Sequence, residues 1–199
     1  MTVRTQGLTY HWPGFSLRVP DMAVNEGESH AITGASGCGK TTLLRLLSGE
    51  LVGQGTVEVL GTALGSLSEG ERRRFRLTRL GLVFQDYPLM AALDARHNVA
   101  LPLRLAGQDG LERADALLDR LGIRNGPVEA LSQGQRQRVA VARAVVADPG
   151  LVLADEPTSG LDPAASSAVM DLLLGLDRTL IVVTHDPAVR ARLGHELAL

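Results

Sequence analysis

The sequence predicts an α/β fold that has a mostly parallel sheet core and an inserted helical subdomain. Three observations lead to this prediction. Short β-prone segments alternate with segments of helical periodicity, as they do where helices join parallel strands. A glycine-rich loop separates one of these strands from the helix that follows it. The stretch 87–147 contains only helical patterns and therefore interrupts the alternation.

The first half of the chain supplies the strands on either side of the glycine-rich loop. We expect short strands within 17–24 and further strands over 29–33, 55–60 and 82–85. We expect helices over 41–47 and 67–80. Leucines recur at helical spacing in the first of these helices. In the second, Ser68 and Glu71 have the spacing of a capping box, which predicts where the helix begins.

The second half is richer in helices. We expect helices over 93–105, 111–121, 132–147 and 163–174, and strands over 151–154 and 179–184. Ser132 is placed to cap the third helix, and Pro149 and Gly150 follow its end. The run 151–154 is wholly apolar and bounded by a turn and by acids, so it predicts a strand buried on both faces.

Composition excludes several classes of protein. The net charge of -2 argues against non-specific nucleic-acid binding. No run approaches the roughly 20 apolar residues of a membrane helix, and the first residues lack the apolar core of a signal peptide. The single cysteine, Cys38, excludes an internal disulfide and agrees with a cytoplasmic location. Of 20 lysines and arginines only Lys40 is a lysine, which indicates a site that needs a compact ammonium group.

That lysine lies in the pattern G-x-x-x-x-G-K-[ST], a phosphate-binding loop between a strand and a helix. The pattern comprises Gly34, Ala35, Ser36, Gly37, Cys38, Gly39, Lys40 and Thr41, and Thr42 follows it. Glycines let successive N–H groups turn toward one anion, and the helix adds its positive N-terminal end. Lys40 is expected to reach the β- and γ-phosphates of a nucleotide, and Thr41 to bind Mg²⁺. The alternative is a glycine-rich turn that binds nothing.

A second acidic motif ends the apolar strand over 151–154. Asp155 and Glu156 follow it, at the strand end where α/β proteins place ligands. Asp155 is expected to hold Mg²⁺, and Glu156 to orient or polarise the attacking water. The alternative is that two acids merely close a strand before the turn at Pro157.

The segment Leu131-Ser132-Gln133-Gly134-Gln135 resembles the signature motif of ABC-type ATPases, usually written LSGGQ. Gln133 departs from the pattern by replacing its first glycine. Gln85 resembles the glutamine of the family's Q-loop, and His185 resembles its switch histidine. The segment Ser159-Gly160-Leu161-Asp162 resembles its D-loop. These motifs occur in the family's order and cover essentially the whole chain.

This resemblance implies a P-loop NTPase of RecA-like fold with a mostly parallel sheet core and an antiparallel β-subdomain. Residues 1–86 and 148–199 would form the nucleotide-binding core, and 87–147 the helical subdomain that carries the signature. It also implies a homodimer that binds ATP between the phosphate loop of one chain and the signature of the other.

The implied roles extend beyond the phosphate loop. The residues expected to act in catalysis are Lys40, Glu156 and His185. The residues expected to hold Mg²⁺ are Thr41, Gln85 and Asp155. Ser132, Gln133, Gly134, Gln135 and Asp162 are expected to contact the nucleotide.

The family also stacks an aromatic side chain on adenine. Trp12 and Tyr10 are both candidates, and the turn Trp12-Pro13-Gly14 favours Trp12. The alternative is that either ring packs only on the β-subdomain.

The implied partner is a separate transmembrane permease, because no membrane span is fused to the chain. The segment around Gln85, together with Asn98-Val99 and Pro102, resembles the lipoprotein-release and macrolide-export branch. That resemblance implies a four-helix permease with a large extracytoplasmic domain, and a peripheral location on the inner face of the membrane. The alternative is a scaffold of the cell-division type, gated by ATP, through which no solute passes. The substrate, the direction of transport and the identity of the permease do not follow from the sequence.

Two further segments have two interpretations each. The basic cluster Arg72, Arg73, Arg74, Arg76 and Arg79 suggests either nucleic acid or, as we expect, a solvated helix. The segment 87–90 forms either core or part of the groove for the permease.

Overall fold

The computed structural model describes residues 1–84 and 88–199, which form two sheets and the helices around them. The strands are β1 (Val3–Trp12), β2 (Phe15–Arg18), β3 (Met22–Val24), β4 (Ser29–Thr33), β5 (Gln54–Val59), β6 (Thr62–Ala63), β7 (Leu80–Val83), β8 (Leu151–Asp155), β9 (Thr179–Val183) and β10 (His195–Ala198). The helices are α1 (Lys40–Leu47), α2 (Glu69–Arg79), α3 (Ala95–Leu105), α4 (Leu111–Arg120), α5 (Gln133–Val145), α6 (Pro163–Leu174) and α7 (Pro187–Arg190). Short 3₁₀ turns lie at Leu64–Ser66 and Val128–Ala130.

The centre of the fold is a parallel sheet in the order β10-β4-β9-β8-β7. Its central strands β8 and β9 are buried along their whole length. In β9, Leu180 and Val182 face one hydrophobic core, and Ile181 and Val183 face another. Helices or a second sheet therefore cover both faces, which explains the unbroken apolar runs in the sequence. The predicted parallel α/β core is confirmed.

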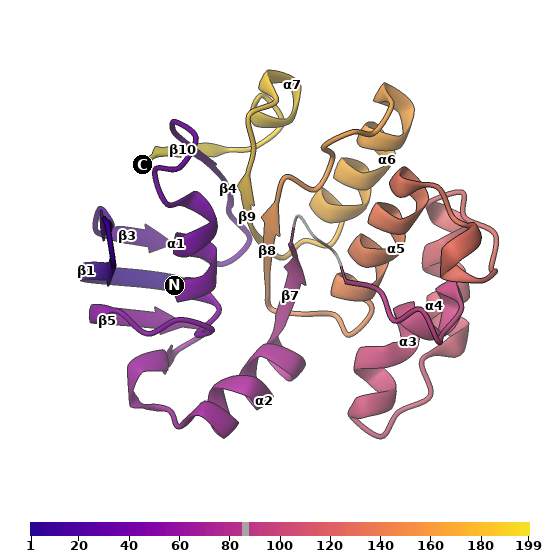
Figure 1. Ribbon diagram of the computed structural model, residues 1–199, viewed down its shortest axis with the longest axis horizontal. Helices are drawn as coiled ribbons and strands as arrows, with labels where there is room; N and C mark the ends of the chain where they lie inside the picture. The colour runs from indigo at the N-terminus through magenta and orange to yellow at the C-terminus, as the bar shows by residue number, and fades with distance from the viewer. Residues whose placement is uncertain (85–87) are drawn as a thin grey trace.

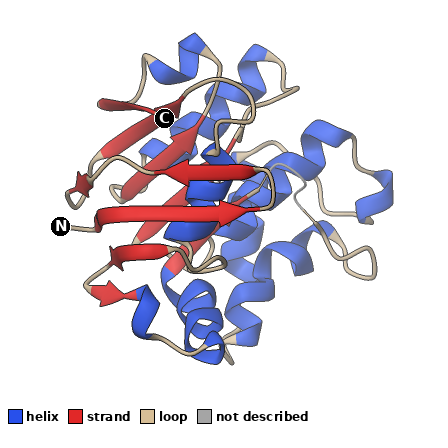
Figure 2. Ribbon diagram, turned by 60° about the vertical axis from the view of Figure 1, so that its left-hand side comes forward, coloured by secondary structure: helices blue, strands red, loops and turns tan. Residues whose placement is uncertain are grey.

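The second sheet is antiparallel, with the order β2-β1-β5-β6 and with β3 also paired to β1. Helix α1 lies between this sheet and the parallel sheet (Figure 1). The leucines of α1 at helical spacing are almost completely buried there: Leu43, Leu44, Leu46 and Leu47. Figure 2 shows the same arrangement with strands in red and helices in blue. The antiparallel β-subdomain implied by the family resemblance is confirmed.

Helices α3, α4 and α5 lie together on the opposite side of the parallel sheet from α1 (Figure 1). Their core is continuous with that of the sheet, because Val99 of α3 and Val141 of α5 belong to the same buried cluster as Val152 of β8. The helical insert is thus confirmed, and its boundaries at 87 and 147 stay a prediction. In the described part of the chain, none of the helices combines the length and the apolar character that crossing a membrane requires.

Side-chain caps fix where several helices begin. Ser68 accepts a hydrogen bond from the Glu71 N–H, and the Glu71 carboxylate accepts one from the Ser68 N–H, which completes the predicted capping box of α2. Ser132 and Gln135 form the same pair at the start of α5. Asp94 caps α3 by accepting from the His97 N–H, so this helix begins two residues later than predicted.

The structure differs from the prediction at several strands, including the short strand β6, which was not predicted. β7 covers 80–83 instead of the predicted 82–85, because it begins directly after the last residue of α2 with no connecting loop. β1 was not predicted, since a bulge near Gly7 (φ 57°) breaks its alternation of buried and exposed residues. β10 was also not predicted, since it is a largely exposed edge strand without an apolar run.

The basic cluster on α2 is partly neutralised within the chain. Arg72 and Arg76 both form ion pairs with Glu69. They also donate hydrogen bonds to the carbonyls of Leu67 and Gly49. These contacts support the interpretation of this cluster as a structural, solvated helix.

We predict that Asn98→Ala lowers the free energy of unfolding by about 2–4 kcal/mol. Asn98 is completely buried at the start of α3. Its amide accepts from the Met90 N–H at 2.8 Å and donates to the carbonyls of Met90, Leu93 and Asp94. Removing the amide takes a partner from the Met90 N–H and the Leu93 carbonyl and leaves a gap at a completely buried position. The Met90 and Asp94 carbonyls keep backbone donors. Urea unfolding measures the effect, and exposed Asn125→Ala is the control, with an expected loss below about 1 kcal/mol. Equal losses for the two variants would contradict this account of Asn98.

Candidate functional site

The phosphate loop lies between β4 and α1, and its glycines adopt conformations that other residues rarely reach. φ is 145° at Gly34, 78° at Gly37 and 108° at Gly39. A Cβ atom at Gly34 would lie 2.7 Å from the Leu199 carbonyl oxygen, and one at Gly39 would lie 2.9 Å from a methyl group of Leu17. Backbone conformation therefore favours glycine at all three positions, and lack of space also requires it at Gly34 and Gly39.

The first N–H groups of α1 are available to a ligand. No acceptor for the N–H groups of Lys40, Thr41 and Thr42 is found among residues 1–84 and 88–199, and no side chain caps this helix. All three residues line one cavity, the main cavity, which Asp155, Glu156 and His185 also line. Unpaired N–H groups at a helix start attract an anion, so this end of the cavity is suited to a phosphate group.

Lys40 lies across the same loop. Its side chain is largely buried, and its ammonium group donates to the carbonyls of Gly34 at 2.9 Å and Ala35 at 2.8 Å. This holds a positive charge beside the unpaired N–H groups. Cys38 is close to this ammonium, with its sulfur 4.0 Å from the Lys40 nitrogen.

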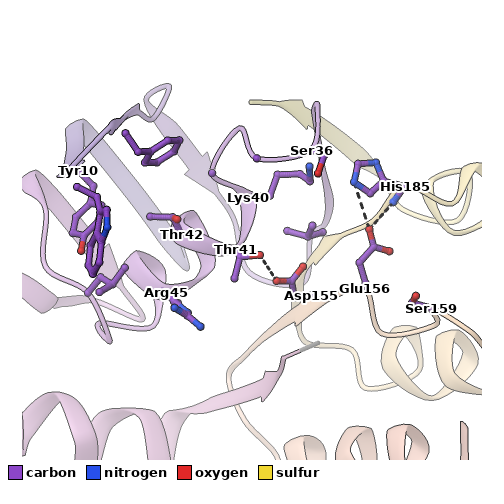
Figure 3. Close-up of a pocket in the computed structure, with 16 residues that line it drawn as sticks. Tyr10, Ser36, Lys40, Thr41, Thr42, Arg45, Asp155, Glu156, Ser159 and His185 are labelled. Carbon is purple, nitrogen blue, oxygen red and sulfur yellow. Dashed lines mark hydrogen bonds and ion pairs between the residues drawn. The ribbon is translucent and has the colours of Figure 1, made fainter. Parts of the chain in front are cut away.

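Thr41 and Asp155 join the phosphate loop to the end of β8. The Thr41 hydroxyl donates to the Asp155 carboxylate at 2.6 Å (Figure 3), and Asp155 is almost completely buried. A hydroxyl and a carboxylate are hard oxygen donors of the kind that Mg²⁺ prefers. These two residues therefore fit the predicted metal site. Gln85, the third predicted ligand, lies outside the described residues.

Glu156 and His185 lie beside one another in the lining of the cavity (Figure 3). One carboxylate oxygen of Glu156 accepts a hydrogen bond from the backbone N–H of His185 at 3.1 Å. The Nε2 atom of the His185 ring lies 3.8 Å from the same oxygen. Burial raises the pKa of Glu156, and the neighbouring Asp155 charge raises it further, against the lowering effect of His185 and Lys40. A carboxylate with a raised pKa beside a histidine is suited to accept a proton from water.

A buried glutamine fixes the backbone of Glu156, and the sequence reasoning missed it. Gln137 of α5 donates from its amide nitrogen to the Glu156 carbonyl at 3.1 Å. Glu156 has a left-handed backbone, with φ 49°, so this bond stabilises an uncommon conformation. Since α5 begins at the signature segment, the bond connects that segment to the acidic pair within one chain.

The main cavity of about 800 Å³ is lined by Lys40, Thr41, Asp155, Glu156 and His185. Tyr10 and Trp12 both line it, and 63% of the Trp12 surface is exposed. The structure adds four lining residues that the sequence reasoning missed: Phe15, Arg45, Leu51 and Val183. It also places Ser159 of the D-loop segment in the lining. A hairpin signal was available for Phe15, because it pairs with Trp12 across the turn. No local pattern distinguishes Arg45, Leu51 or Val183 as site residues.

The signature segment does not line this cavity. The exposed Ser132 and Gln133 lie at the start of α5 with Gly134 and Gln135. Gly134 is close to the D-loop segment, since a Cβ there would lie 3.0 Å from a methyl group of Leu161. Asp162 is also outside the cavity lining and caps α6 by accepting from the Ala165 N–H. The predicted residues therefore form two separate groups on one chain.

Comparison with known proteins gives consistent matches. A model of the ABC transporter family matches residues 17–159. The lipoprotein-releasing system ATP-binding protein LolD of Xanthomonas campestris pv. campestris (strain 8004) is 44% identical over 214 residues, covering 99% of this chain and 89% of that protein. LolD of Alcanivorax borkumensis is 41% identical over 196 residues, covering 92% and 85%. A solved structure of the ATP-binding cassette MJ0796, a dimer in a post-hydrolysis state bound to ADP and Pi, has a TM-score of 0.91 at 31% identity and covers 99% of this chain and 94% of its own.

We predict that Glu156→Gln raises the thermal unfolding midpoint at pH 7.5 and that the gain disappears near pH 4. The pKa of Glu156 is raised in the folded protein, mainly by burial. Above both pKa values the carboxylate is charged in the folded and the unfolded protein, and the charge costs more free energy in the folded one, so it lowers stability. Below the unfolded pKa of about 4.3 the group is protonated in both states and this cost is absent. Glutamine keeps the acceptor for the His185 N–H and removes only the charge.

Calorimetry or fluorescence-monitored melting at the two pH values measures this difference. Glu58→Gln is the control, because Glu58 is exposed on β5 and does not line the cavity. A gain for Glu156→Gln that is the same at pH 7.5 and near pH 4 would refute the assigned cause.

Proposed function

Because this chain belongs to the ABC transporter family, we propose that it is the motor subunit of a lipoprotein-release transporter, active as a dimer that binds ATP between its two copies. It binds and hydrolyses ATP to power transport. The observation that carries the dimer proposal is the separation of the signature segment from the cavity of its own chain. A second copy would bring its signature to that cavity. The dimeric state of the similar cassette MJ0796, bound to ADP and Pi, supports this arrangement.

The phosphate end of the cavity would bind ATP through charge and N–H groups. The N–H groups of residues 40–42 and the Lys40 ammonium would hold the β- and γ-phosphates. Thr41 and Asp155, with Gln85, would hold Mg²⁺. When bound, that ion neutralises charge that develops on the phosphate oxygens. Either Trp12 or Tyr10 would stack on adenine.

Glu156 and His185 would act on the attacking water. The Glu156 carboxylate would accept a hydrogen bond from the water and draw a proton from it as the water oxygen attacks the γ-phosphate. His185 would keep that carboxylate in position through its backbone N–H and would contact the γ-phosphate with its imidazole ring. Gln137 would position Glu156 by holding its carbonyl.

The signature would complete the site from the partner. Ser132, Gln133, Gly134 and Gln135 begin α5, so the partner's helix would add a second positive N-terminus and a hydroxyl to the γ-phosphate. Asp162 lies in the adjacent segment and would lie at the same interface. Loss of the γ-phosphate would remove these contacts and loosen the dimer, which links hydrolysis to motion.

The relatives named lipoprotein-releasing system ATP-binding proteins support the choice of transporter class. The chain would bind a separate permease on the inner face of the membrane and would not contact the lipoprotein. The segment 88–90, with Met90 exposed, would belong to the permease-binding surface; Tyr87 lies outside the described residues.

The trans arrangement predicts complementation between two defective chains. Ser132→Ala and Lys40→Ala homodimers should each hydrolyse ATP at least about 10-fold more slowly than wild type. In a mixed dimer, the intact cavity of the Ser132→Ala chain faces the intact signature of the Lys40→Ala chain. A mixture should therefore recover up to about a quarter of the wild-type rate, since about half of randomly paired dimers are mixed and each holds one intact site. Steady-state ATPase assays of mixtures measure it. No recovery in a mixture shown to contain mixed dimers would mean that each signature serves its own cavity.

The transporter proposal predicts what the ATP-bound dimer captures. The Glu156→Gln variant with ATP, used as bait on detergent-solubilised membranes of the native host, should retain a permease with a large extracytoplasmic domain. Lys40→Ala with ATP is the matched control and should retain much less. A permease accompanied by a separate solute-binding protein would contradict the release function. Dimerisation of the bait without any membrane protein would contradict transport itself and favour a different ATP-gated role.

A further inference from the structure

A cluster of metal-ligand side chains lies at the far end of β4 from the phosphate loop. Glu28 directly precedes β4, His30 is the second residue of β4, and His195 begins β10. β4 and β10 are parallel neighbours whose register pairs His195 with His30. The two imidazole rings are stacked, with centroids 4.6 Å apart and planes inclined by 21°. None of the three residues lines the main cavity.

The donor atoms of this cluster are close enough for one ion. The Glu28 carboxylate oxygen and the His30 Nε2 are 3.0 Å apart, and donor atoms of all three residues lie within 4.8 Å of one another. Two neighbouring ligand atoms of a tetrahedral zinc ion, with bonds of about 2.0–2.1 Å, are about 3.3 Å apart. The Glu28–His30 pair is thus already near the spacing of two ligands.

Other groups hold the carboxylate ready to bind. Asn25 donates to one oxygen of Glu28 from its backbone N–H at 2.9 Å and to the other from its amide at 2.8 Å. These bonds from Asn25, followed by that from His30, lower the pKa of Glu28 to about 2, so the carboxylate is charged at neutral pH. Outer hydrogen bonds of this kind orient the ligands of known metal sites.

The backbone also fixes the two strand starts relative to one another. The Gly194 N–H donates to the Ser29 hydroxyl at 3.0 Å, immediately before both histidines. The Leu180 N–H donates to the Glu28 carbonyl at 3.0 Å and ties the third ligand to β9. In stacked imidazole rings the nitrogen lone pairs point in nearly parallel directions and do not converge on one ion. Binding therefore requires the His195 ring to turn toward Glu28 and His30. His195 is exposed, so it has room to turn.

We propose that Glu28, His30 and His195 bind a divalent transition-metal ion such as Zn²⁺, with water completing the coordination. Two imidazoles and a carboxylate are a ligand set that zinc readily accepts. The bound ion joins β10 to β4. It therefore holds the edge strand whose last residues lie against the phosphate loop, where the Leu199 N–H donates to the Thr33 carbonyl. Its role is structural, and it is separate from the ion that Thr41 and Asp155 would hold.

Titration of the untagged, EDTA-treated full chain with ZnCl₂ in a calorimeter tests this proposal. We expect one Zn²⁺ per chain at this site and a rise in the thermal midpoint when it is bound. His195→Ala and Glu28→Gln should each weaken binding at least about 10-fold and abolish the rise in the midpoint. His195 and Glu28 are at the surface, so both variants are expected to fold.

Two control variants separate this site from other histidines. His11→Ala, an exposed position on the β1–β2 hairpin, should bind Zn²⁺ as wild type does. His185→Ala should also keep the site, because His185 lies in the main cavity. The proposal is overturned if wild type binds no Zn²⁺, if His195→Ala and Glu28→Gln bind it unchanged, or if the loss occurs in His185→Ala instead.

Discussion

The hydrogen bond between Thr41 and Asp155 is the contact on which the geometry of the site depends. It joins the first turn of α1 to the last residue of β8, two positions 114 residues apart in the chain. The bond forms because β4 and β8 end at the same edge of the parallel sheet and α1 packs back against β8. Residues of the glycine-rich loop and the first turn of α1 therefore meet the acidic pair at the end of β8. Any shift of α1 relative to β8 would separate them.

The two neighbouring carboxylates serve different partners because the backbone changes direction between them. Along a regular strand, Asp155 and Glu156 would point to opposite faces of the sheet. The left-handed conformation of Glu156 ends this alternation, and both side chains line the cavity. Asp155 is held by the Thr41 hydroxyl, whereas Glu156 is held by the His185 N–H and, at its carbonyl, by Gln137. The different environments separate a carboxylate suited to bind a cation from one suited to accept a proton.

The sequence predicted those parts of the fold that short segments determine. The glycine-rich loop between β4 and α1, the caps at Ser68 and Ser132, the apolar strand β8 and the family all follow from short motifs, and the structure and comparisons confirm them. The roles of the site residues stay predictions. The structure added features that depend on distant contacts, such as the Gln137 bond to Glu156 and the pairing of His195 with His30. Edge strand β10 and bulged strand β1 lack a regular pattern, so only their long-range pairing identifies them.

The exposure of His185 explains why such a protein would act as a pair. The His185 side chain is 57% exposed, and the signature segment of the same chain does not line the cavity. Hydrolysis at such a site gains from the exclusion of bulk water, which strengthens the electrostatic interactions around the phosphate. In the proposed dimer a partner surface would provide that cover, and ATP would hold it through contacts to both chains. Covering the site and closing the dimer would then be one event. Hydrolysis would remove the phosphate that both chains contact, so the chemical step itself would release the closed state and deliver the movement to the permease.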